Sequence, residues 1–514
     1  MSLEEFKKSP WAKSHERYSK SALSLVPAPE YANSEVLIAG LYRVIGMKDL
    51  QDGGKLLSEG KVPGYGRQLD RKVGLHRDKG TTPEGAALDG DAFHVLLREV
   101  MESPKLQNQS KKRFIQVTPL VGETASFSGS ARLAGNPWPA GSLVRRMVWL
   151  GSPDAQAATG SWNKLFAALR VEEKDDVFAR FLRDELVAWT GQPWGPECLP
   201  PEADSVVCLP PDEFKGLALP ARQFTRDLES IIAAKPMLTR RQWTSLLEAI
   251  IRIAGVAHVA WICEVQRRIW GVLGDVLRGE TALADVRSLI YPRQFEYLRY
   301  GASAVSGLKD RTSRYLRARL GINTLLWSME EAGVLPEGGL STASEVTNLA
   351  AAVEQHRGVL GEVIRLADDL ADQESRALRC GKGVGSNVME FARHVLYQRL
   401  AENQLLRGYD QGYVLRKRGS AKNSQWICAP GPVALLALVH CSLAGLSGPR
   451  SVQRLAQHLE AYGIMVGHRE IATNGLGHQL RMLGLVLDSP DAESGMLLIP
   501  PFAGTRRVHG EGRL

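Results

Sequence analysis

The prediction of the fold begins with residues 432–463, which read PVALLALVHCSLAGLSGPRSVQRLAQHLEAYG. The first part, from Pro432 to Ala444, is apolar enough for a buried helix, and Ser447-Gly448-Pro449 predicts a turn after it. Ser451 can cap a second helix that ends at Gly463. The apolar residues of this second helix recur at the spacing of one helical face: Val452, Leu455, Ala456, Leu459 and Tyr462.

A third helix and a hairpin are predicted after this pair. The helix follows Thr473 and places Leu476, Leu480 and Leu483 on one side. Two short apolar runs come next, at 485–487 and 496–499, and the residues between them favour a turn. Three short helices followed by a hairpin predict a winged helix-turn-helix from Pro432 to Phe502.

Composition and charge set the broad class. The 514 residues carry a formal net charge of +8, which is compatible with a polyanionic partner such as nucleic acid. The N-terminal residues lack the apolar core of a signal peptide. The most apolar run, Ala249 to Cys263, contains Arg252 and His258, so we expect a buried helix and not a membrane span. We therefore expect a cytoplasmic protein without direct membrane insertion.

The six cysteines give no sign of a metal or cofactor site. None forms a Cys-x-x-Cys pair, and scattered thiols are typical of a reducing compartment. We expect structural or incidental roles for all six cysteines, no bound metal and no cofactor.

The pattern along the chain predicts a mainly α, multidomain protein. Residues 1–190 read as a mixed α/β domain, and residues 191–220 read as a proline-rich linker. Residues 221–410 are helical almost throughout, residues 411–505 hold a basic hairpin and the winged helix, and residues 506–514 form a basic tail. The helices expected in the central part are 222–234, 239–278, 281–290, 292–306, 309–332, 342–378 and 386–408.

The predicted third helix offers side chains that can reach DNA. If its leucine face is buried, the polar residues Asn474, His478, Gln479 and Arg481 point toward solvent. Asn, Gln and Arg can form paired hydrogen bonds with base edges in the major groove. Arg450, at the start of the preceding helix, adds a cation. The hairpin tip is acidic, with Asp488, Asp491 and Glu493, so a protein-docking role for this domain is an alternative.

A second cluster, Tyr291 to Arg319, holds many arginines and five interleaved aromatic residues. Its candidate phosphate contacts are Arg293, Arg299, Arg311, Arg314 and Arg317. Arg311, Arg314 and Arg317 recur about one helical turn apart and can line one face. The tyrosines and Phe295 can stack on bases, or they can belong to the core with the arginines in salt bridges.

A third cluster lies on the strand-turn-strand pattern from Tyr413 to Cys428. Its cations Arg416, Lys417, Arg418 and Lys422 lie at or near the turn. A basic hairpin beside a helix-turn-helix can grip the DNA backbone without reading the sequence. A solvated turn is the alternative.

Two patterns raise the question of catalysis. Pro211 to Lys215 contains the residue types of a nuclease metal site, but they are contiguous in a proline-rich loop. Glu402 and His440 lie in consecutive predicted helices, where a buried Glu–His hydrogen bond would join the two helices. A structural pair is the favoured interpretation, because a catalytic pair or a metal site would need further ligands.

Glu402 and His440 lie in a long helical region, from about residue 220 to 445. This arrangement resembles the EH-signature domain of the C component of Zorya antiphage systems. The resemblance implies a cytoplasmic DNA-binding protein whose defence partners include a proton-driven membrane motor and a nuclease-helicase. We therefore expect a non-catalytic component of a bacterial antiphage or DNA-processing complex that binds double-stranded DNA mainly through its backbone. The alternatives are a protein-docking adaptor and a metal-dependent nuclease.

Overall fold

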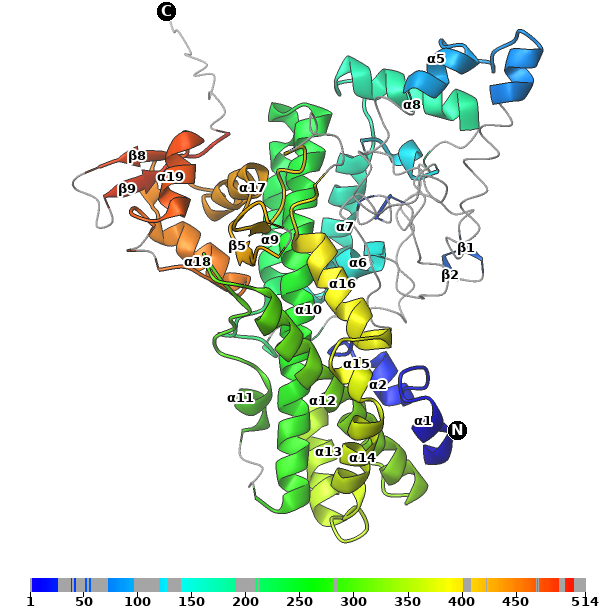
Figure 1. The fold of residues 1–514 in the computed structure, drawn as a ribbon, viewed down its shortest axis with the longest axis vertical. Helices are drawn as coiled ribbons and strands as arrows, with labels where there is room; N and C mark the ends of the chain where they lie inside the picture. Colours follow the sequence, from blue (N-terminus) through cyan, green and yellow to red (C-terminus); the bar gives the residue numbers. More distant parts are fainter. Residues whose placement is uncertain are drawn as a thin grey trace, which may run out of the picture.

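The protein is mainly helical (Figure 1). A computed structural model describes residues 2–25, 38, 41–42, 51–52, 55–56, 73–96, 120–126, 140–190, 194, 209, 212–280, 285–400, 408–421, 423–467, 469, 471–489 and 495–502. Glu402, Lys422 and the basic tail at 506–514 lie outside these residues, as do Asp491 and Glu493.

In its described ranges, the N-terminal part contains short helices and a small hairpin. Its strands are β1 (Gln51–Asp52) and β2 (Lys55–Leu56), which pair antiparallel. Its described helices include α1 (Leu3–Lys8), α2 (Glu16–Lys20), α5 (Gly90–Val95), α6 (Ala140–Gly151), α7 (Ala155–Leu169) and α8 (Val177–Thr190). The chain reverses between α7 and α8, where Asp175 and Asp176 hold the turn by accepting hydrogen bonds from the backbone N–H groups of Glu172 and Ala179.

The longest helix, α10 (Arg240–Arg278), runs through the middle of the molecule (Figure 1). The side chain of Thr239 and that of Gln242 cap its first turn reciprocally, and Gly279 ends it at a φ of 78°. α10 is long and apolar enough to cross a membrane, but 94% of its most apolar window is buried inside the protein. A helix that is apolar on all sides is also what the centre of a large protein core requires.

The remaining helices of the central part pack on α10 or on its neighbour α12. They are α9 (Pro220–Ala234), α11 (Val286–Ile290), α12 (Val305–Glu331), α13 (Ala343–Gln355), α14 (Val363–Gln373), α15 (Ser375–Leu378) and α16 (Gly383–Leu396). The predicted helix 239–278 is confirmed, and the prediction for 309–332 is confirmed with an earlier start. The predicted single helix 342–378 is wrong, because the chain forms three shorter helices there.

Two further helix predictions fail where the backbone pairs with distant segments. Residues 292–306 were expected to be helical, but β3 (Leu298–Arg299) lies there and α12 begins only at Val305. Residues 386–408 were expected to form one helix, but α16 ends at Leu396 because Tyr397 bridges Leu415. In both places hydrogen bonds to residues far along the chain replace those within a helix.

The C-terminal lobe, residues 432–502, consists of short helices and a small sheet. Its helices are α17 (Pro432–Ser442), α18 (Gln453–Ala461) and α19 (Gly475–Met482). Its strands are β6 (Arg450–Ser451), β7 (Ile464–Met465), β8 (Val486–Asp488) and β9 (Met496–Leu498). The antiparallel sheet has the order β6-β9-β8, so Leu498 pairs with Arg450 on one side and with Val486 on the other.

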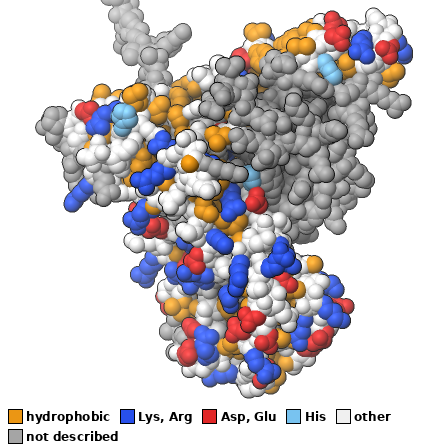
Figure 2. Space-filling model, viewed as in Figure 1, with side chains coloured by type: hydrophobic (Ala, Val, Ile, Leu, Met, Phe, Trp, Pro, Cys, Tyr) orange, Lys and Arg blue, Asp and Glu red, His pale blue; other side chains and the backbone are white. Residues whose placement is uncertain are grey.

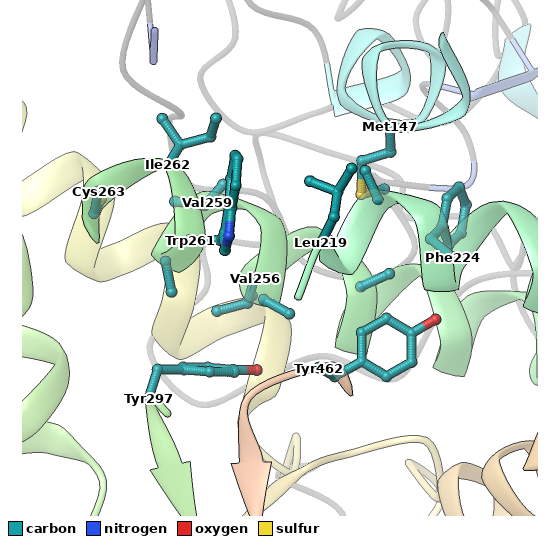
Figure 3. Packing of buried hydrophobic residues seen from close by; sticks show 14 of the residues in the cluster. Met147, Leu219, Phe224, Val256, Val259, Trp261, Ile262, Cys263, Tyr297 and Tyr462 are labelled. Carbon is teal, nitrogen blue, oxygen red and sulfur yellow. The ribbon is translucent and has the colours of Figure 1, made fainter. Parts of the chain in front are cut away.

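One hydrophobic core extends from Leu3 to Leu498 and includes residues of the N-terminal, central and C-terminal parts. Figure 3 shows Met147, Leu219, Tyr297 and Tyr462, which come from four parts of the chain, packed around α10 residues such as Val256. A second, smaller core lies among residues 73–189 and is centred on Trp189. The main core therefore continues across the predicted domain boundaries at 190, 220 and 410, and the division into domains stays a prediction.

Buried polar groups fix the C-terminal lobe to the central helices. Asp227 on α9 is 1% exposed and accepts hydrogen bonds from His458 Nε2 at 2.9 Å and from the Tyr462 hydroxyl at 2.7 Å. Gln223 Nε2 donates to the other carboxylate oxygen at 2.8 Å. Because a buried carboxylate is costly unless it is hydrogen bonded, this network ties α18 to α9 in one orientation.

Candidate nucleic-acid interface

Residues 297–304, the hub segment, connect the three clusters that the sequence analysis singled out. On one edge, the N–H groups of Tyr297 and Tyr300 donate to the carbonyl oxygens of Gly463 and Met465, both at 2.9 Å. This pairing makes β3 parallel to β7. The hub segment therefore hydrogen bonds directly to the C-terminal lobe.

The other edge of the hub segment pairs with the basic hairpin, residues 413–428. Gly301 N–H donates to the carbonyl oxygen of Cys428 at 2.8 Å, and Cys428 N–H donates to that of Ala302 at 3.1 Å. Ala304 N–H donates to the carbonyl oxygen of Trp426 at 3.1 Å. The arginine block, residues 291–319, thus lies between the basic hairpin and the C-terminal lobe.

Gly463 is the position that allows the lobe to approach so closely. Its φ is +72°, and a Cβ built on it would lie 2.5 Å from the ring of Phe295 and 3.0 Å from that of Tyr297. A residue with a side chain would be strained there and would push the two rings away. The predicted end of the second helix at Gly463 is confirmed by the end of α18 at Ala461.

The basic hairpin forms as its pattern predicts, from β4 (Leu415–Lys417) and β5 (Trp426–Cys428). Arg416 and Arg418 are exposed. Lys417 Nζ lies 5.8 Å from the centre of the Trp426 ring, which stacks on Tyr397 with ring centroids 3.6 Å apart. The stacking of Trp426 on Tyr397 therefore fixes the base of the hairpin. Its exposed cations, Arg416 and Arg418, lie on a strand and in the turn.

Arg416 lies close to the junction of the hairpin and the hub segment. Burial raises the pKa of Tyr300, and the nearby Arg416 guanidinium opposes this rise. Tyr413 has a pKa raised by burial and opposed by Arg416 in the same way. Arg416 therefore places a positive charge where the hairpin and the hub segment meet.

The aromatic residues of the arginine block belong mostly to the core. Tyr291, Phe295, Tyr297 and Tyr315 are at most 7% exposed. The alternative that they stack on bases is wrong for these four, because they are buried: Tyr291 packs against Phe214 and Trp261, and Phe295 stacks on Tyr297. The Tyr315 hydroxyl donates to the carbonyl oxygen of Leu25. Tyr300 is half-buried and is the one aromatic side chain of the described block that also borders solvent.

The arginines of the block differ in how they are engaged. Arg311 is half-buried and donates to Glu264 at 3.2 Å and to the carbonyl oxygen of Glu296. Arg299 and Arg314 are exposed and pair with Glu296 and Asp310, at 2.9 and 2.7 Å. Among the described residues, the exposed Arg293 and Arg317 form no ion pair.

A groove of about 490 Å³ lies between α10, the hub segment and α12. Four arginines line it, namely Arg267, Arg299, Arg311 and Arg314. Glu264, Glu296 and Asp310 also line it, which leaves an excess of one positive charge. Burial would raise the pKa of Glu264, but Arg267, Arg268 and Arg311 outweigh burial and hold it below its ordinary value. The groove is therefore nearly neutral, and the free cations lie outside it.

The cations that remain free lie on the surface around these elements. Figure 2 shows Lys and Arg side chains gathered between the C-terminal lobe and the lower helices, whereas the lower end of the molecule carries both signs of charge. A phosphate backbone would meet positive charge on the first of these surfaces.

Within α19, the polar residues predicted to read bases are placed differently. Asn474 caps the helix, since its side-chain oxygen accepts from the N–H groups of Leu476 and Gly477 at 2.9 and 3.3 Å. Arg481 donates to Asp488 on β8 at 2.9 Å and to the carbonyl oxygen of Ala472. In the structure these bonds hold the lobe together, and base contacts by Asn474 and Arg481 stay a prediction. His478 is exposed and Gln479 is half-buried.

The burial of the leucine face of α19 is confirmed for Leu476 and Leu480, both 0% exposed. Leu483 was expected to be buried too, but it is 38% exposed because the helix ends at Met482. Met482 and Leu487 are exposed as well, at 75% and 49%. Arg450 is exposed on β6, and its guanidinium donates to the carbonyl oxygen of its neighbour, Pro449, at 3.2 Å.

The predicted pair of Glu402 and His440 stays a prediction, because Glu402 lies outside the described residues. His440 Nε2 lies 3.2 Å from the carbonyl oxygen of Ser230, to which it donates. Burial lowers the pKa of His440, so its imidazole is neutral at pH 7. The carbonyl of Ser230 therefore satisfies the polar group that the sequence places in an apolar helix.

The nuclease-like residues near Pro211 have structural partners. Glu213 accepts a hydrogen bond from the Tyr291 hydroxyl at 2.5 Å and from the N–H group of Ala343 at 2.6 Å. These bonds join the loop to α13 and do not bring Glu213 together with Asp212 and Lys215 as ligands. In the described part of the chain, no group of three or more His, Cys, Asp or Glu residues could hold a metal ion.

Sequence patterns did not reveal two buried networks of charged and polar side chains. Asp227, His458 and Tyr462 form one such network, and Arg252 with Asp410 forms another. A signal was present, because Asp227 and Arg252 each interrupt the apolar face of a predicted helix. Such a residue needs a buried partner, although the sequence does not say which one.

Comparison with known proteins does not assign the chain to a family. No protein-family model matches the sequence, and no curated protein matches it.

Proposed function

We propose that the protein binds double-stranded DNA mainly through phosphate contacts, on the surface formed by the arginine block, the basic hairpin and the C-terminal lobe. One observation carries this proposal. The backbone hydrogen bonds of the hub segment bring the arginine block together with the basic hairpin and the C-terminal lobe, which follow much later in the sequence. Arg293, Arg317, Arg416 and Arg418 supply exposed guanidinium groups, which suit phosphate oxygens.

The C-terminal lobe has the features of a winged helix, and we include that assignment in the proposal. Apart from β7, which pairs with β3 outside the lobe, the order of its elements is helix, strand, helix, helix, strand, strand, and its sheet has the first strand beside the last. In this assignment α19 is the recognition helix, and β8 and β9 form the wing. The engagement of Asn474 and Arg481 leaves His478 and Gln479 as the polar side chains of α19 for base contacts.

The cellular role in the proposal rests on the resemblance to the EH-signature domain. We propose a cytoplasmic component of a bacterial antiphage or DNA-processing complex, with protein partners and without a reaction of its own. DNA binding is the part of this role that the purified protein can test directly.

A gel-shift titration with a duplex of mixed sequence tests DNA binding. The protein should shift the duplex at low salt, and its affinity should fall at least about tenfold between ~50 and ~200 mM salt, because phosphate contacts release counterions. No shift at low salt would contradict the proposal. Degradation of the duplex on addition of magnesium or manganese would favour the nuclease alternative.

Charge reversal locates the surface. Arg416→Glu combined with Arg418→Glu should weaken duplex binding at least about tenfold, since each change replaces an attraction to phosphate by a repulsion. Arg77→Glu combined with Lys174→Glu changes the net charge by the same amount on exposed residues, one before α5 and one between α7 and α8. In Figure 1, α5 and α8 lie apart from the C-terminal lobe. If both double variants lose the same affinity, binding follows net charge alone and the surface is wrong.

The exposed apolar residues of α19 and β8 favour a second function. Met482, Leu483 and Leu487 border the position where a recognition helix would meet DNA, and apolar side chains gain nothing from phosphate. A protein-docking lobe explains them better. In that case Met482→Ser with Leu487→Ser would abolish binding of a protein partner and leave the gel shift unchanged.

A further inference from the structure

A cavity of about 630 Å³ lies outside the proposed DNA surface. It is bounded by the end of α6, by α7, by α9 and by the residues around Phe214. Its lining shares no residue with the arginine block, the basic hairpin or the C-terminal lobe. A function of this cavity is therefore independent of DNA binding.

Four cations and one carboxylate line the cavity among the described residues. The cations are Lys164, Lys215, Arg222 and Arg226, and the carboxylate is Glu229. Glu229 accepts from Lys164 Nζ and from the Ser161 hydroxyl, at 3.2 and 3.3 Å. The lining thus carries an excess of three positive charges, compared with one in the groove beside α12. Of these cations, Lys215 also lies 3.9 Å from the carboxylate of Asp212, which is outside the lining.

Arg222 and Arg226 lie one turn apart on α9 and repel each other. The pKa of Arg222 is lowered, first by burial and second by the charge of Arg226. Arg222 donates to the carbonyl oxygen of Phe214 at 3.2 Å, whereas Arg226 is exposed and has no ion pair in the part of the chain that the structure describes. Neither arginine forms an ion pair with a carboxylate among the described residues. An anion placed between the two guanidinium groups would therefore stabilise them.

The rest of the lining provides space and an apolar floor. Leu150, Leu209 and Phe214 are buried at its base. Gly160 on α7 also lines the cavity, and a Cβ at this position would meet nothing within 4 Å, so the helix surface there faces open space. A cavity of this size, with apolar walls and a few converging polar groups, is typical of a small-molecule site.

We propose that this cavity binds a small phosphorylated molecule with two or more negative charges and an apolar or aromatic body, of about the size of a nucleotide. The phosphate groups contact Arg226, Arg222 and the rim lysines. The body of the molecule packs on Phe214 and Leu209. Arg226 is the main specificity determinant, because its guanidinium is free of protein partners among the described residues.

Calorimetric titration of the full-length protein tests the site, with ADP and pyrophosphate as probes and adenosine as the uncharged control. ADP should bind saturably, pyrophosphate should bind more weakly than ADP and compete with it, and adenosine should bind at least about tenfold more weakly than ADP. Absence of saturable binding by both anions at millimolar concentration would overturn the proposal. So would displacement of ADP by duplex DNA, because it would assign the bound anion to the DNA surface.

Two opposite substitutions assign the binding to this cavity. Arg226→Gln should weaken ADP binding about tenfold, because it removes a charge-assisted phosphate contact. Glu229→Gln should strengthen ADP binding a few-fold, since it removes the carboxylate that repels the anion and holds Lys164. Arg241→Gln, at an exposed position on α10 outside the cavity, is the matched control and should leave the affinity unchanged. Equal affinities of all three variants would place the bound anion elsewhere.

Discussion

At the scale of single residues, a buried network of ion pairs joins α10 to the segment that precedes the basic hairpin. Arg252 is 0% exposed, and its two terminal nitrogens donate to both oxygens of Asp410, at 2.7 and 3.1 Å. Arg399 donates to Asp410 through its backbone N–H and its Nε, at 2.9 and 3.3 Å. Burial would raise the pKa of Asp410, but the two guanidinium groups outweigh burial and hold it well below its ordinary value.

The low pKa of Asp410 predicts how stability depends on pH. Because the pKa is depressed in the folded state, the contribution of this carboxylate is full above its ordinary pKa of about 4 and is lost as the pH falls toward the folded value. Asp410→Asn should lower the free energy of unfolding by about 3 kcal/mol at pH 7, since it leaves the two buried arginines, Arg252 and Arg399, with Glu248 as their single carboxylate among the described residues. In urea titrations, this difference should stay constant from about pH 8 to pH 5 and shrink below about pH 4.

The control is Asp184→Asn, whose carboxylate is exposed and pairs with Arg183. An exposed pair contributes little, so this variant should lose less than about 1 kcal/mol at pH 7. A difference for Asp410→Asn that grows as the pH falls would have the wrong sign and would contradict the assignment of a depressed pKa.

Residue types alone could not separate free arginines from engaged ones. Arg311, Arg317 and Arg319 lie within nine residues, yet only Arg317 is both exposed and without an ion pair among the described residues. Arg319 is 2% exposed and bonds to the carbonyl oxygen of Trp11, which is about three hundred residues away in the sequence. The sequence identifies the cluster, but the partner of each arginine depends on long-range packing.

At the scale of elements, the helices with local signals were predictable and the hub segment was not. Thr239 and Gly279 mark the ends of α10, and the predicted range differs from the observed one by a single residue. The hub segment carries no such local signal. Its backbone partners are Gly463, Met465, Trp426 and Cys428, so its extended form is imposed by contacts with distant parts of the chain.

The contact at Gly463 leads to a prediction about how the lobe is attached. Gly463→Ala places a Cβ 2.5 Å from the Phe295 ring at a φ of +72°, so the chain must give up the pairing with β3 or move the ring. We expect the free energy of unfolding to fall by about 2–4 kcal/mol. Duplex binding should weaken too, because the lobe loses its position beside the arginine block. Urea titration and gel shift measure the two effects.

Gly484→Ala is the matched control, since Gly484 has a φ of +66° and a Cβ there would meet nothing within 4 Å. It should show only the backbone strain of about 1–2 kcal/mol and normal DNA affinity. Equal losses of affinity in both variants would show that the contact with Phe295 does not set the position of the lobe.

At the scale of the whole molecule, the first and the last described parts of the chain share the central core. The sequence pattern predicts a separate domain for residues 1–190, because the proline-rich composition of residues 191–220 is typical of a linker. The structure packs α1 and α2 against α12, with Trp11 Nε1 donating to Glu374 at 2.8 Å and His15 N–H donating to Asn323 at 2.7 Å. Composition detects a proline-rich stretch, but it does not show which core the chain before that stretch joins.

The buried Arg319 provides the test of this organisation. It donates to the carbonyl oxygen of Trp11 at 3.0 Å and to the Ser14 hydroxyl at 3.1 Å, and its guanidinium lies 5.7 Å from the Trp11 ring. Arg319→Leu should lower the free energy of local opening of residues 2–25 by about 2 kcal/mol, which corresponds to roughly 30-fold faster tryptic cleavage after residues such as Lys13.

The matched control is the exposed Arg317 on the same helix. Arg317→Leu should leave tryptic cleavage of the N-terminal residues unchanged, because its side chain has no contact with them among the described residues. Mass spectrometry of the early fragments compares the two variants at the same bonds. If cleavage of residues 2–25 is equally slow in both, the N-terminal helices are held by their apolar contacts and not by Arg319. If Arg319→Leu speeds cleavage throughout the chain, the first 25 residues and the central helices open together as one cooperative unit, and not by a local opening.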